Sequence, residues 1–294
     1  MASGCRYLDF QLFSASGGTL YVGHSDTPNS ETVDTTLTFS ETLGYISQYA
    51  FTYDTNARAK LLDVLDSKNE KVENPKGSTL YSTFIKYPLF VNLRINRAKD
   101  SELDIIDTIY TKYLNPKSKT PIVPLQFFHR KQGIAMPVDA ETLLSSLKRK
   151  IVFVMDIDNI LQNYTKTHNA DDIPIATRSV IQKFVNIKSG GHTWKTYNNY
   201  TTVETSQKMP LYSKEDGYTT NSANMYLALP SSSNSANPSA IQFLQDYRIQ
   251  TSPHRYYIDD TNLEKYEKMF EELKKPIAPL AHVLRYAKSI TTIS

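Results

Sequence analysis

Cysteine is nearly missing from this sequence, which has a single residue of that type, Cys5, among its 294 residues. One cysteine cannot form a disulfide within the chain, and it cannot build a zinc cluster of cysteines. This usage is typical of proteins that fold in a reducing compartment. We interpret Cys5 as a buried structural thiol rather than a catalytic nucleophile.

Long apolar runs and strong charge are also lacking. No stretch approaches the ~20 residues that span a bilayer, which predicts no transmembrane segment. The opening MASGCRYLDF has no basic segment followed by an apolar run, so we expect an intracellular, non-secreted protein. The net charge is only +3, from 33 basic and 30 acidic residues, which is too weak by itself to indicate a basic binding face. A nucleic-acid partner is therefore not predicted.

Short catalytic motifs are equally scarce. The chain has no glycine-rich phosphate loop and no G-x-S-x-G sequence, which argues against nucleotide binding and serine hydrolase chemistry. Its six histidines are scattered, and none has the close spacing of a helical metal site. Asp156 and Asp158 end an apolar run on one face, where α/β folds place ligands. A cation site is one interpretation, and we favour a solvated strand end.

Apolar strands and amphipathic helices alternate along the chain. Strands are expected at 6–13, 19–24, 88–95, 150–157 and 248–257, and helices at 40–51, 101–114, 139–150, 241–247, 261–275 and 276–288. We expect Ser40 to cap one helix, and Thr261 and Glu264 to form a capping box on another. Continuous apolar strands next to such helices are typical of an α/β fold with parallel strands.

The length suits one large domain, which we place at 1–294. Long polar loops are expected around 67–79 and 189–237, where hydrophobic periodicity is weak. The chain also has 20 tyrosines. Tyrosine combines an apolar body with a polar tip, so these residues suit an interface, although many could simply line strands.

The order of the segments resembles the X-type catalytic domain of phosphatidylinositol-specific phospholipase C. The sequences GCRYLDFQ, YVGH, YISQYAF and YPLFVNLRI stand, in that order, where the family has an acidic strand, a His-Gly hairpin, a helix and a Tyr-Pro strand. LKRKIVFVMD and RIQTSPHRYYIDDTNLEKYEKMF resemble the next strand and the closing strand and helix, so the likeness runs from Gly4 to about Lys288. It implies a distorted (β/α) TIM-type barrel of the PLC-like phosphodiesterase kind. The short motifs LDF, PLF and LRI are most similar to those of divergent family members carried by large DNA viruses.

The family's catalytic residues carry over poorly. Its members cleave a phosphodiester with two histidines, and eukaryotic members add a calcium ion held by carboxylates. The strand with the first histidine would precede Gly4, which implies an upstream strand or an incomplete barrel whose gap a partner closes. The position of the second histidine is Val22, with His24 on the other side of Gly23.

The family's carboxylates are also altered. The first acidic position is kept as Asp9, whereas the second is Gln11 and the one in the Tyr-Pro strand is Arg94. An amide and a cation at these positions would strongly disfavour a divalent ion. An arginine could instead stabilise a phosphate, as in bacterial-type members of the family.

These changes favour a catalytically degenerate barrel, a pseudoenzyme that serves as a structural or binding protein without a cofactor. Its expected partners are other chains of a large assembly, such as capsid proteins, with the chain as a minor capsid or virion component. The alternative is an active phosphoric diester hydrolase that cleaves phosphatidylinositol or a related lipid, with calcium, using His24, Asp9 and Arg94. A third hypothesis is a module that binds phosphate head groups through Arg94 and Arg97 without turnover.

Overall fold

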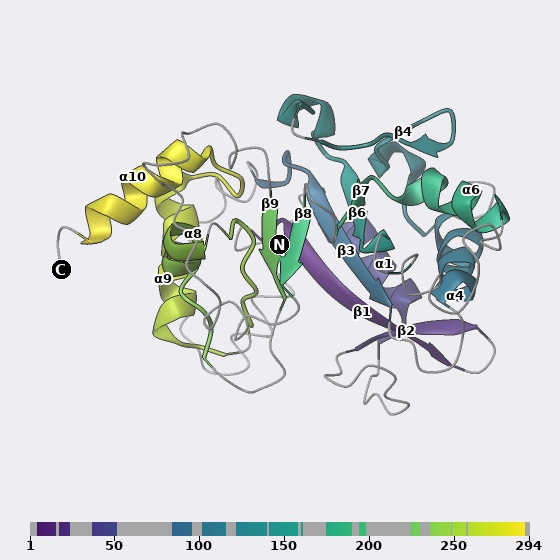
Figure 1. Ribbon diagram of the computed structural model, residues 1–294, viewed down its shortest axis with the longest axis horizontal. Coiled ribbons are helices and arrows are strands. Elements are labelled where there is room, and N and C mark those ends of the chain that lie inside the picture. Colours follow the sequence, from purple (N-terminus) through teal and green to yellow (C-terminus); the bar gives the residue numbers. More distant parts are fainter. Residues whose placement is uncertain are drawn as a thin grey trace.

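The computed structural model describes residues 5–15, 18–23, 37–51, 84–95, 102–115, 122–139, 141–157, 160, 175–189, 194–197, 225–229, 236–247, 249–256 and 258–291. These residues form a mixed α/β molecule in which helices cover a largely parallel sheet (Figure 1). Within this part of the chain, every helix is too short or too polar to serve as a bilayer-spanning segment.

A five-stranded sheet forms the centre of the fold. Its strand order is β2 (Thr19–Gly23), β1 (Tyr7–Ala15), β3 (Leu89–Ile95), β6 (Ile151–Met155) and β7 (Ile187–Lys188). β1, β3, β6 and β7 run parallel, and β2 pairs with β1 as an antiparallel hairpin. The expectation of a parallel α/β sheet is therefore confirmed.

One face of this sheet is covered by helices. The helical layer consists of α1 (Phe39–Tyr49), α4 (Glu102–Thr108), the π-helix η1 (Ile109–Leu114) that continues α4, and α6 (Ile175–Phe184). Leu12, Val91 and Phe153 point into this layer and are fully buried. Burying a side chain of this size stabilises the fold by ~1.5–3 kcal/mol relative to exposure, so the alternating apolar residues of the strands fix their register.

The opposite face of the sheet packs against a second group of strands. β8 (Trp194–Tyr197) and β9 (Met225–Ala228) form a parallel pair, and Leu227 also makes a parallel bridge to Thr251. The inward residues of β9 and of the main sheet share one apolar cluster, which includes Leu227, Leu229, Tyr7, Phe90, Val152 and Val154. The alternate residues of β9 pack outward against α8 (Ala240–Tyr247).

Two arcs of parallel strands thus face each other across a common interior, with helices outside each arc. Figure 1 shows β8 and β9 beside β1, and α8 beyond them. Within the described ranges, no backbone ladder joins the two arcs. The α/β character is established, and closure into a barrel stays a prediction.

The C-terminal helices form a layer of their own. α9 (Thr261–Leu273) and α10 (Leu280–Thr291) follow α8 and lie at the end of the molecule where the chain terminates (Figure 1). Met269, Phe270 and Tyr286 from these helices bury Phe84, which precedes β3. The C-terminal helices are therefore anchored to the central sheet.

The helix expected at 139–150 is wrong. The structure has only a 3-10 turn, η3 (Leu144–Leu147), and Leu143 is 72% exposed. Asp139 and Thr142 hydrogen-bond to each other and to the local backbone, which competes with helix formation. Because Leu147 is the only leucine of this segment that is buried, no apolar face stabilises a longer helix.

The strand expected at 248–257 is also wrong. In the part of this segment that the structure describes, Thr251 alone makes a β-bridge, and the chain then continues without strand pairing. Pro253 lacks the N–H that a ladder would need. The long polar region 189–237 departs from expectation in the other direction, since β8 and β9 lie within it. The loop expected at 67–79 lies outside the described residues.

Both expected helix caps are displaced. Thr38, not Ser40, caps α1, and its capping box with Glu41 has both reciprocal hydrogen bonds. Asp260, not Thr261, caps α9, because its carboxylate accepts the Leu263 N–H at 2.8 Å. Glu41 lies in the first turn of α1, where a negative charge is favoured by the helix dipole.

Candidate functional site

Three levels of side chains cross β1, β3 and β6 on the face that points away from the helical layer. The parallel registers align Tyr7 with Phe90 and Val152, then Asp9 with Asn92 and Val154, then Gln11 with Arg94. Asp156 follows Met155, the partner of Leu93, so continuing the register places Asp156 next to Arg94. The face becomes more polar towards the carboxyl ends of the strands, where α/β sheets place their ligands.

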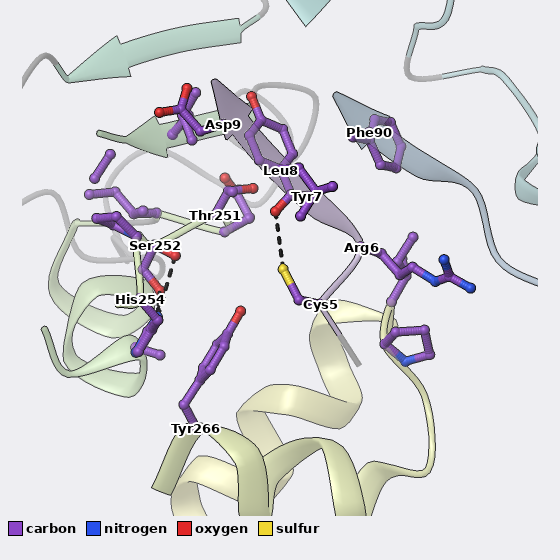
Figure 2. Close-up of a pocket in the computed structure, with 18 of the residues that line it drawn as sticks. Cys5, Arg6, Tyr7, Leu8, Asp9, Phe90, Thr251, Ser252, His254 and Tyr266 are labelled. Carbon is purple, nitrogen blue, oxygen red and sulfur yellow. Dashed lines mark hydrogen bonds between the residues drawn. The ribbon is translucent and has the colours of Figure 1, made fainter. Parts of the chain in front are cut away.

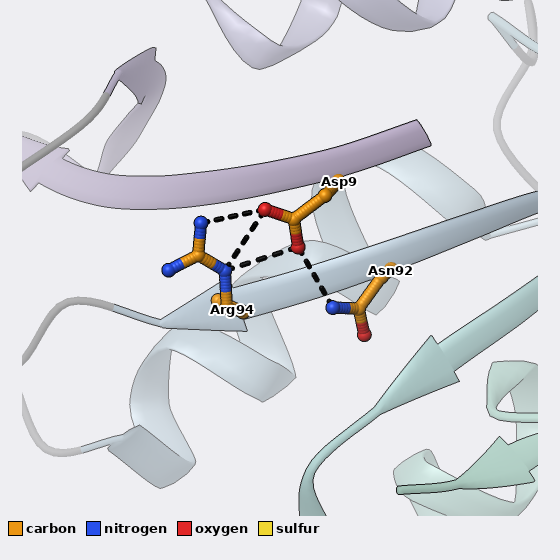
Figure 3. Close-up of polar contacts among 3 residues, drawn as sticks. All are labelled: Asp9, Asn92 and Arg94. Atoms are coloured by element: carbon orange, nitrogen blue, oxygen red, sulfur yellow. Dashed lines mark hydrogen bonds and ion pairs between the residues drawn. The ribbon is translucent and has the colours of Figure 1, made fainter. Parts of the chain in front are cut away.

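Asp9 and Arg94 form a bidentate ion pair at these levels (Figure 3). Arg94 Nη2 donates to Asp9 Oδ2 at 2.6 Å, and Arg94 Nε donates to Asp9 Oδ1 at 3.0 Å. Asn92 Nδ2 donates to the same Oδ1 at 2.8 Å. The two charged side chains are only 22% and 17% exposed, so they neutralise each other away from bulk water.

This pairing limits the chemistry of the site. Both oxygens of Asp9 already accept hydrogen bonds from Arg94 and Asn92, so a cation that binds this carboxylate must compete with the Arg94 guanidinium. Arg94 uses its Nε–H and one Nη2–H on Asp9, so an anion could reach only the remaining N–H groups of the guanidinium, beside the Asp9 carboxylate. Among the described residues, no group of three acidic, histidine or cysteine side chains could hold a metal ion.

The hairpin of β1 and β2 places two of the remaining predicted site residues, Gln11 and Val22, on opposite faces of the sheet. Gln11 is buried and lies opposite Gly23, on the same face as Asp9. Val22 lies opposite Leu12 and packs with the core beneath the helical layer, so its side chain is on the other face. His24 lies outside the described residues. Arg97 and Asp158 do so as well, which leaves their predicted roles untested.

A cavity of about 870 Å³ adjoins the ion pair. It lies between β1 and the C-terminal segments, with Asp9, Gln11 and Arg94 at one end and Cys5 and His254 at the other. The β1–β2 ladder begins only at Gln11, so the earlier half of β1 meets the cavity along the edge that faces away from β3. The cavity therefore follows the seam between the two arcs of strands.

Sequence analysis missed the polar cluster at the far end of the cavity. His254 stacks face to face on Tyr266 from α9, with ring centroids 3.8 Å apart and planes 5° apart. The ring of Tyr266 points into the cavity below Cys5, whose Sγ–H donates to the carbonyl of Tyr7 at 3.1 Å (Figure 2). No local motif connects these residues, which belong to segments that meet only in the folded chain.

His254 and Tyr266 are uncharged at neutral pH. Burial lowers the pKa of His254 to about 4, and its Nε2 is buried without a hydrogen-bond partner in the described structure. Its Nδ1 lies 3.4 Å from the carbonyl oxygen of Ser252. Burial also raises the pKa of Tyr266 and of Tyr256. The stacked pair of His254 and Tyr266 is therefore neutral, in contrast to the charged pair at the other end.

Comparison with known proteins gives similarity at the level of structure. No protein-family model matches the chain, and no curated protein matches it significantly. Crystal structures of PLC21 from L. pealei and from S. officinalis are similar to it, with TM-scores of 0.45 and 0.47 and sequence identities of 13% and 12%. The matches cover 90% and 92% of this chain, which spans only 31% of the length of either PLC21 chain.

Proposed function

We propose that this chain is a catalytically degenerate α/β barrel of the phospholipase C-like kind, which works as a binding and structural protein. The observation that carries the proposal is the ion pair between Asp9 and Arg94. According to the resemblance, members of the family have a carboxylate at each of these two positions. In this chain one of the two positions is a cation, Arg94, which forms an ion pair with the other, Asp9. The strands that carry the site are therefore present, while its charged side chains neutralise each other.

Acid–base catalysis lacks support at the matching positions. The second catalytic histidine of the family corresponds to Val22, which packs on the face opposite Asp9. Gln11 replaces an acidic residue with a neutral amide. Each general acid or base contributes ~10²–10⁴-fold to a rate, so losing both would leave little turnover.

Calcium does not fit these residues. Calcium prefers several oxygen ligands with net negative charge. The register brings two carboxylates to this edge, Asp9 and Asp156, and the oxygens of Asp9 already accept hydrogen bonds from Arg94 and Asn92. A divalent cation would have to displace the Arg94 guanidinium and then remain next to it, which is electrostatically unfavourable.

Closure of the two arcs into a distorted barrel is part of the proposal. Its support is the alternation of β9, which packs Leu227 inward and Tyr226 outward against α8, as a barrel strand does. We further propose that the protein is intracellular and belongs to the particle of a large DNA virus, with capsid chains as partners. The sequence phrasing of LDF, PLF and LRI supports that assignment.

A second candidate is a phosphodiesterase that acts on an inositol phospholipid. The observation in its favour is that Gly23 lines the cavity opposite Gln11, so His24 follows a residue of the cavity wall. In that case His24 would act as the base, and Arg94 would leave Asp9 to stabilise the phosphate. We rank this candidate lower because it requires the ion pair to open.

The test combines turnover with calcium binding. The full chain and its His24→Ala variant are assayed on phosphatidylinositol and on bis(p-nitrophenyl) phosphate, with and without Ca²⁺. Calcium binding is followed by titration calorimetry for the same protein and for a Gln11→Asp/Arg94→Glu variant, which restores the carboxylates of the family. We expect no turnover and no binding by the wild-type chain, and binding by the double variant.

Two results would contradict the proposal. Turnover that His24→Ala abolishes would establish the phosphodiesterase, and calcium binding by the wild-type chain would refute the argument from charge. Membership of a particle is tested separately, by sedimentation of material from cells that produce the protein naturally. We expect the chain in the particle fraction, and a chain found only as free protein would contradict this role.

A further inference from the structure

The cavity along the seam is elongated. Its wall follows β1 from Cys5 to Gln11 and is completed on the other side by α8, by α9 and by the segment 249–256. Six residue steps along a strand at ~3.3 Å each give a length of ~20 Å. A volume of about 870 Å³ spread over that length describes a channel rather than a round pocket.

The walls of this channel are mostly apolar. Large hydrophobic residues from three parts of the fold line it, namely Leu227 of β9, Ile241 and Leu244 of α8, and Met269 of α9. Away from the polar groups at the two ends, such a lining would leave the hydroxyl groups of a sugar or a nucleoside unsatisfied. It suits a methylene chain, since each buried CH₂ contributes ~0.8 kcal/mol.

The charges that line the channel are of one sign, apart from Asp9. Arg94 is neutralised by Asp9, and the guanidinium of Arg6 is held by the carbonyls of Phe84 and Ala50. Lys275 remains, half-buried just beyond the end of α9, with no carboxylate in ion-pair range among the residues described. Arg255 also lines the channel, and Lys275 offers a cation to a ligand that enters near the end of α9.

From the apolar length and the position of Lys275, we propose that the channel is a binding site for a long-chain fatty acid. The alkyl chain lies along β1, and the carboxylate pairs with Lys275. This inference goes beyond the proposed function, because binding in the seam requires neither turnover nor a metal. It holds whether or not His24 proves to be catalytic.

Displacement of a fluorescent fatty acid tests the site. The full chain is loaded with cis-parinaric acid and titrated with palmitate, hexadecanol, octanoate or inorganic phosphate. We expect palmitate to displace the probe best. Octanoate should bind at least 100-fold more weakly, because it buries eight fewer methylene groups. Hexadecanol should bind about 10-fold more weakly, because it lacks the charge that pairs with Lys275.

Three variants separate the channel from the rest of the surface. Ile241→Trp fills the channel and should abolish binding of the probe. Ile134→Trp makes the same change at a residue that is 56% exposed and outside the channel, and should bind like the wild-type chain. Lys275→Met should leave the affinity for hexadecanol unchanged and remove the preference for palmitate. Thermal unfolding of each variant establishes that it is folded.

Four results would overturn the proposal. They are the absence of probe binding to the folded wild-type chain, equal binding by Ile241→Trp, displacement by inorganic phosphate alone, and a palmitate preference that survives Lys275→Met. None of them bears on catalysis, since the phosphodiesterase and calcium assays do not use this probe. Failure of the lipid site and failure of the proposed function are therefore distinguishable.

Discussion

At the level of single residues, Asn186 and His254 both place polar atoms in the interior but satisfy them differently. The Oδ1 of Asn186 accepts the N–H of Phe153, and its Nδ2 donates to the carbonyls of His129 and Met136. This side chain joins β6 to the segment before it. His254 instead leaves Nε2 without a partner in the described residues and stacks its ring on Tyr266.

The unsatisfied nitrogen of His254 predicts a pH dependence of stability. Burial lowers the pKa of His254 from its ordinary value of 6.5 to about 4 in the folded chain. As the pH falls from 6.5 towards 4, the unfolded chain therefore binds a proton that the folded chain does not. The free energy of unfolding should drop by roughly 2–3 kcal/mol from this group alone.

Urea unfolding at pH 7.5 and pH 4.5 measures this contribution. His254→Phe keeps an aromatic ring on Tyr266 and lacks the titrating group, so it should lose less stability between the two pH values than the wild-type chain. His282 is exposed, and His282→Phe should follow the wild-type chain. Equal losses in all three proteins would show that His254 does not titrate as its burial requires.

Sequence analysis identified Asp9 and Arg94 as site residues, and the structure brings them into contact. What the sequence could not predict is that the two side chains form an ion pair with each other. The two residues are 85 positions apart, and their pairing depends on the register of two parallel strands. No local pattern carries that register, so the sequence leaves open a phosphate partner for Arg94 and does not predict its pairing with Asp9.

At the level of secondary structure, only one of two hydroxyl residues near the start of α1 caps the helix, although Thr38 and Ser40 are both suitable residue types. Thr38 accepts the Glu41 N–H at 3.1 Å, and Glu41 Oε2 accepts the Thr38 N–H at 2.8 Å. Ser40 lies inside α1 and takes no part in this exchange. The T-x-x-E spacing of a capping box was present in the sequence, and attention to it would have identified the start of the helix.

Replacing each of these residues by alanine tests the assignment. Thr38→Ala should lower the free energy of unfolding by about 1 kcal/mol, because the Glu41 N–H in the first turn loses its acceptor, the Thr38 hydroxyl. Ser40→Ala should change it by less than about 0.5 kcal/mol. Chemical denaturation of the two variants compares them directly, and a larger effect at Ser40 would contradict the observed cap.

The elements that sequence analysis predicted well are those with strong local patterns. The runs at β1, β3 and β6 are apolar enough to be buried, and the structure confirms all three as strands. The helix expected at 139–150 failed because its leucines need a neighbouring surface to cover, and the fold offers one only to Leu147. Local sequence can indicate that a helix would have an apolar face, but it does not show whether the fold provides a surface against which that face can pack.

At the level of the whole molecule, Arg6 connects segments that are far apart in the chain. It is 4% exposed, and its Nη1 donates to Ala50 O at 2.8 Å and its Nε to Phe84 O at 2.9 Å. These partners lie 44 and 78 residues away. The guanidinium also lies 5.7 Å from the ring centroid of Phe51. One side chain thus joins the start of β1 to the segments after α1 and before β3.

Arg6→Met should therefore lower the free energy of unfolding by roughly 2–4 kcal/mol, since it leaves two buried carbonyls without their donors. Arg6→Lys should rescue little, because an ammonium cannot reproduce the planar fork of the guanidinium. Arg285 is exposed, and Arg285→Met should stay within about 0.5 kcal/mol of the wild-type chain. Urea denaturation of the three variants gives the comparison. An Arg6→Lys variant as stable as the wild-type chain would contradict the role of the fork.

The arrangement of the whole molecule was only partly predictable. The alternation of strands and helices indicated a parallel α/β fold, and the five-stranded sheet confirms it. The seam between the arcs was not predictable from local sequence. The segment 248–257, which lies beside the seam, has the composition of a strand, but its described part makes a single β-bridge. Pairing across the seam depends on long-range geometry that periodicity does not encode.

The two arcs also have consequences for synthesis on the ribosome. All five strands of the central sheet lie before Ser189, whereas the strand that covers its inner face ends near Leu229. About forty residues separate these points, which is ~2–8 s of elongation at ~5–20 residues per second. The nascent sheet can bury its helical side during that interval, while Phe90 and Val152 still lack the cover that β9 will supply. The apolar inner face is thus exposed at a defined stage of translation, when a chaperone could bind it.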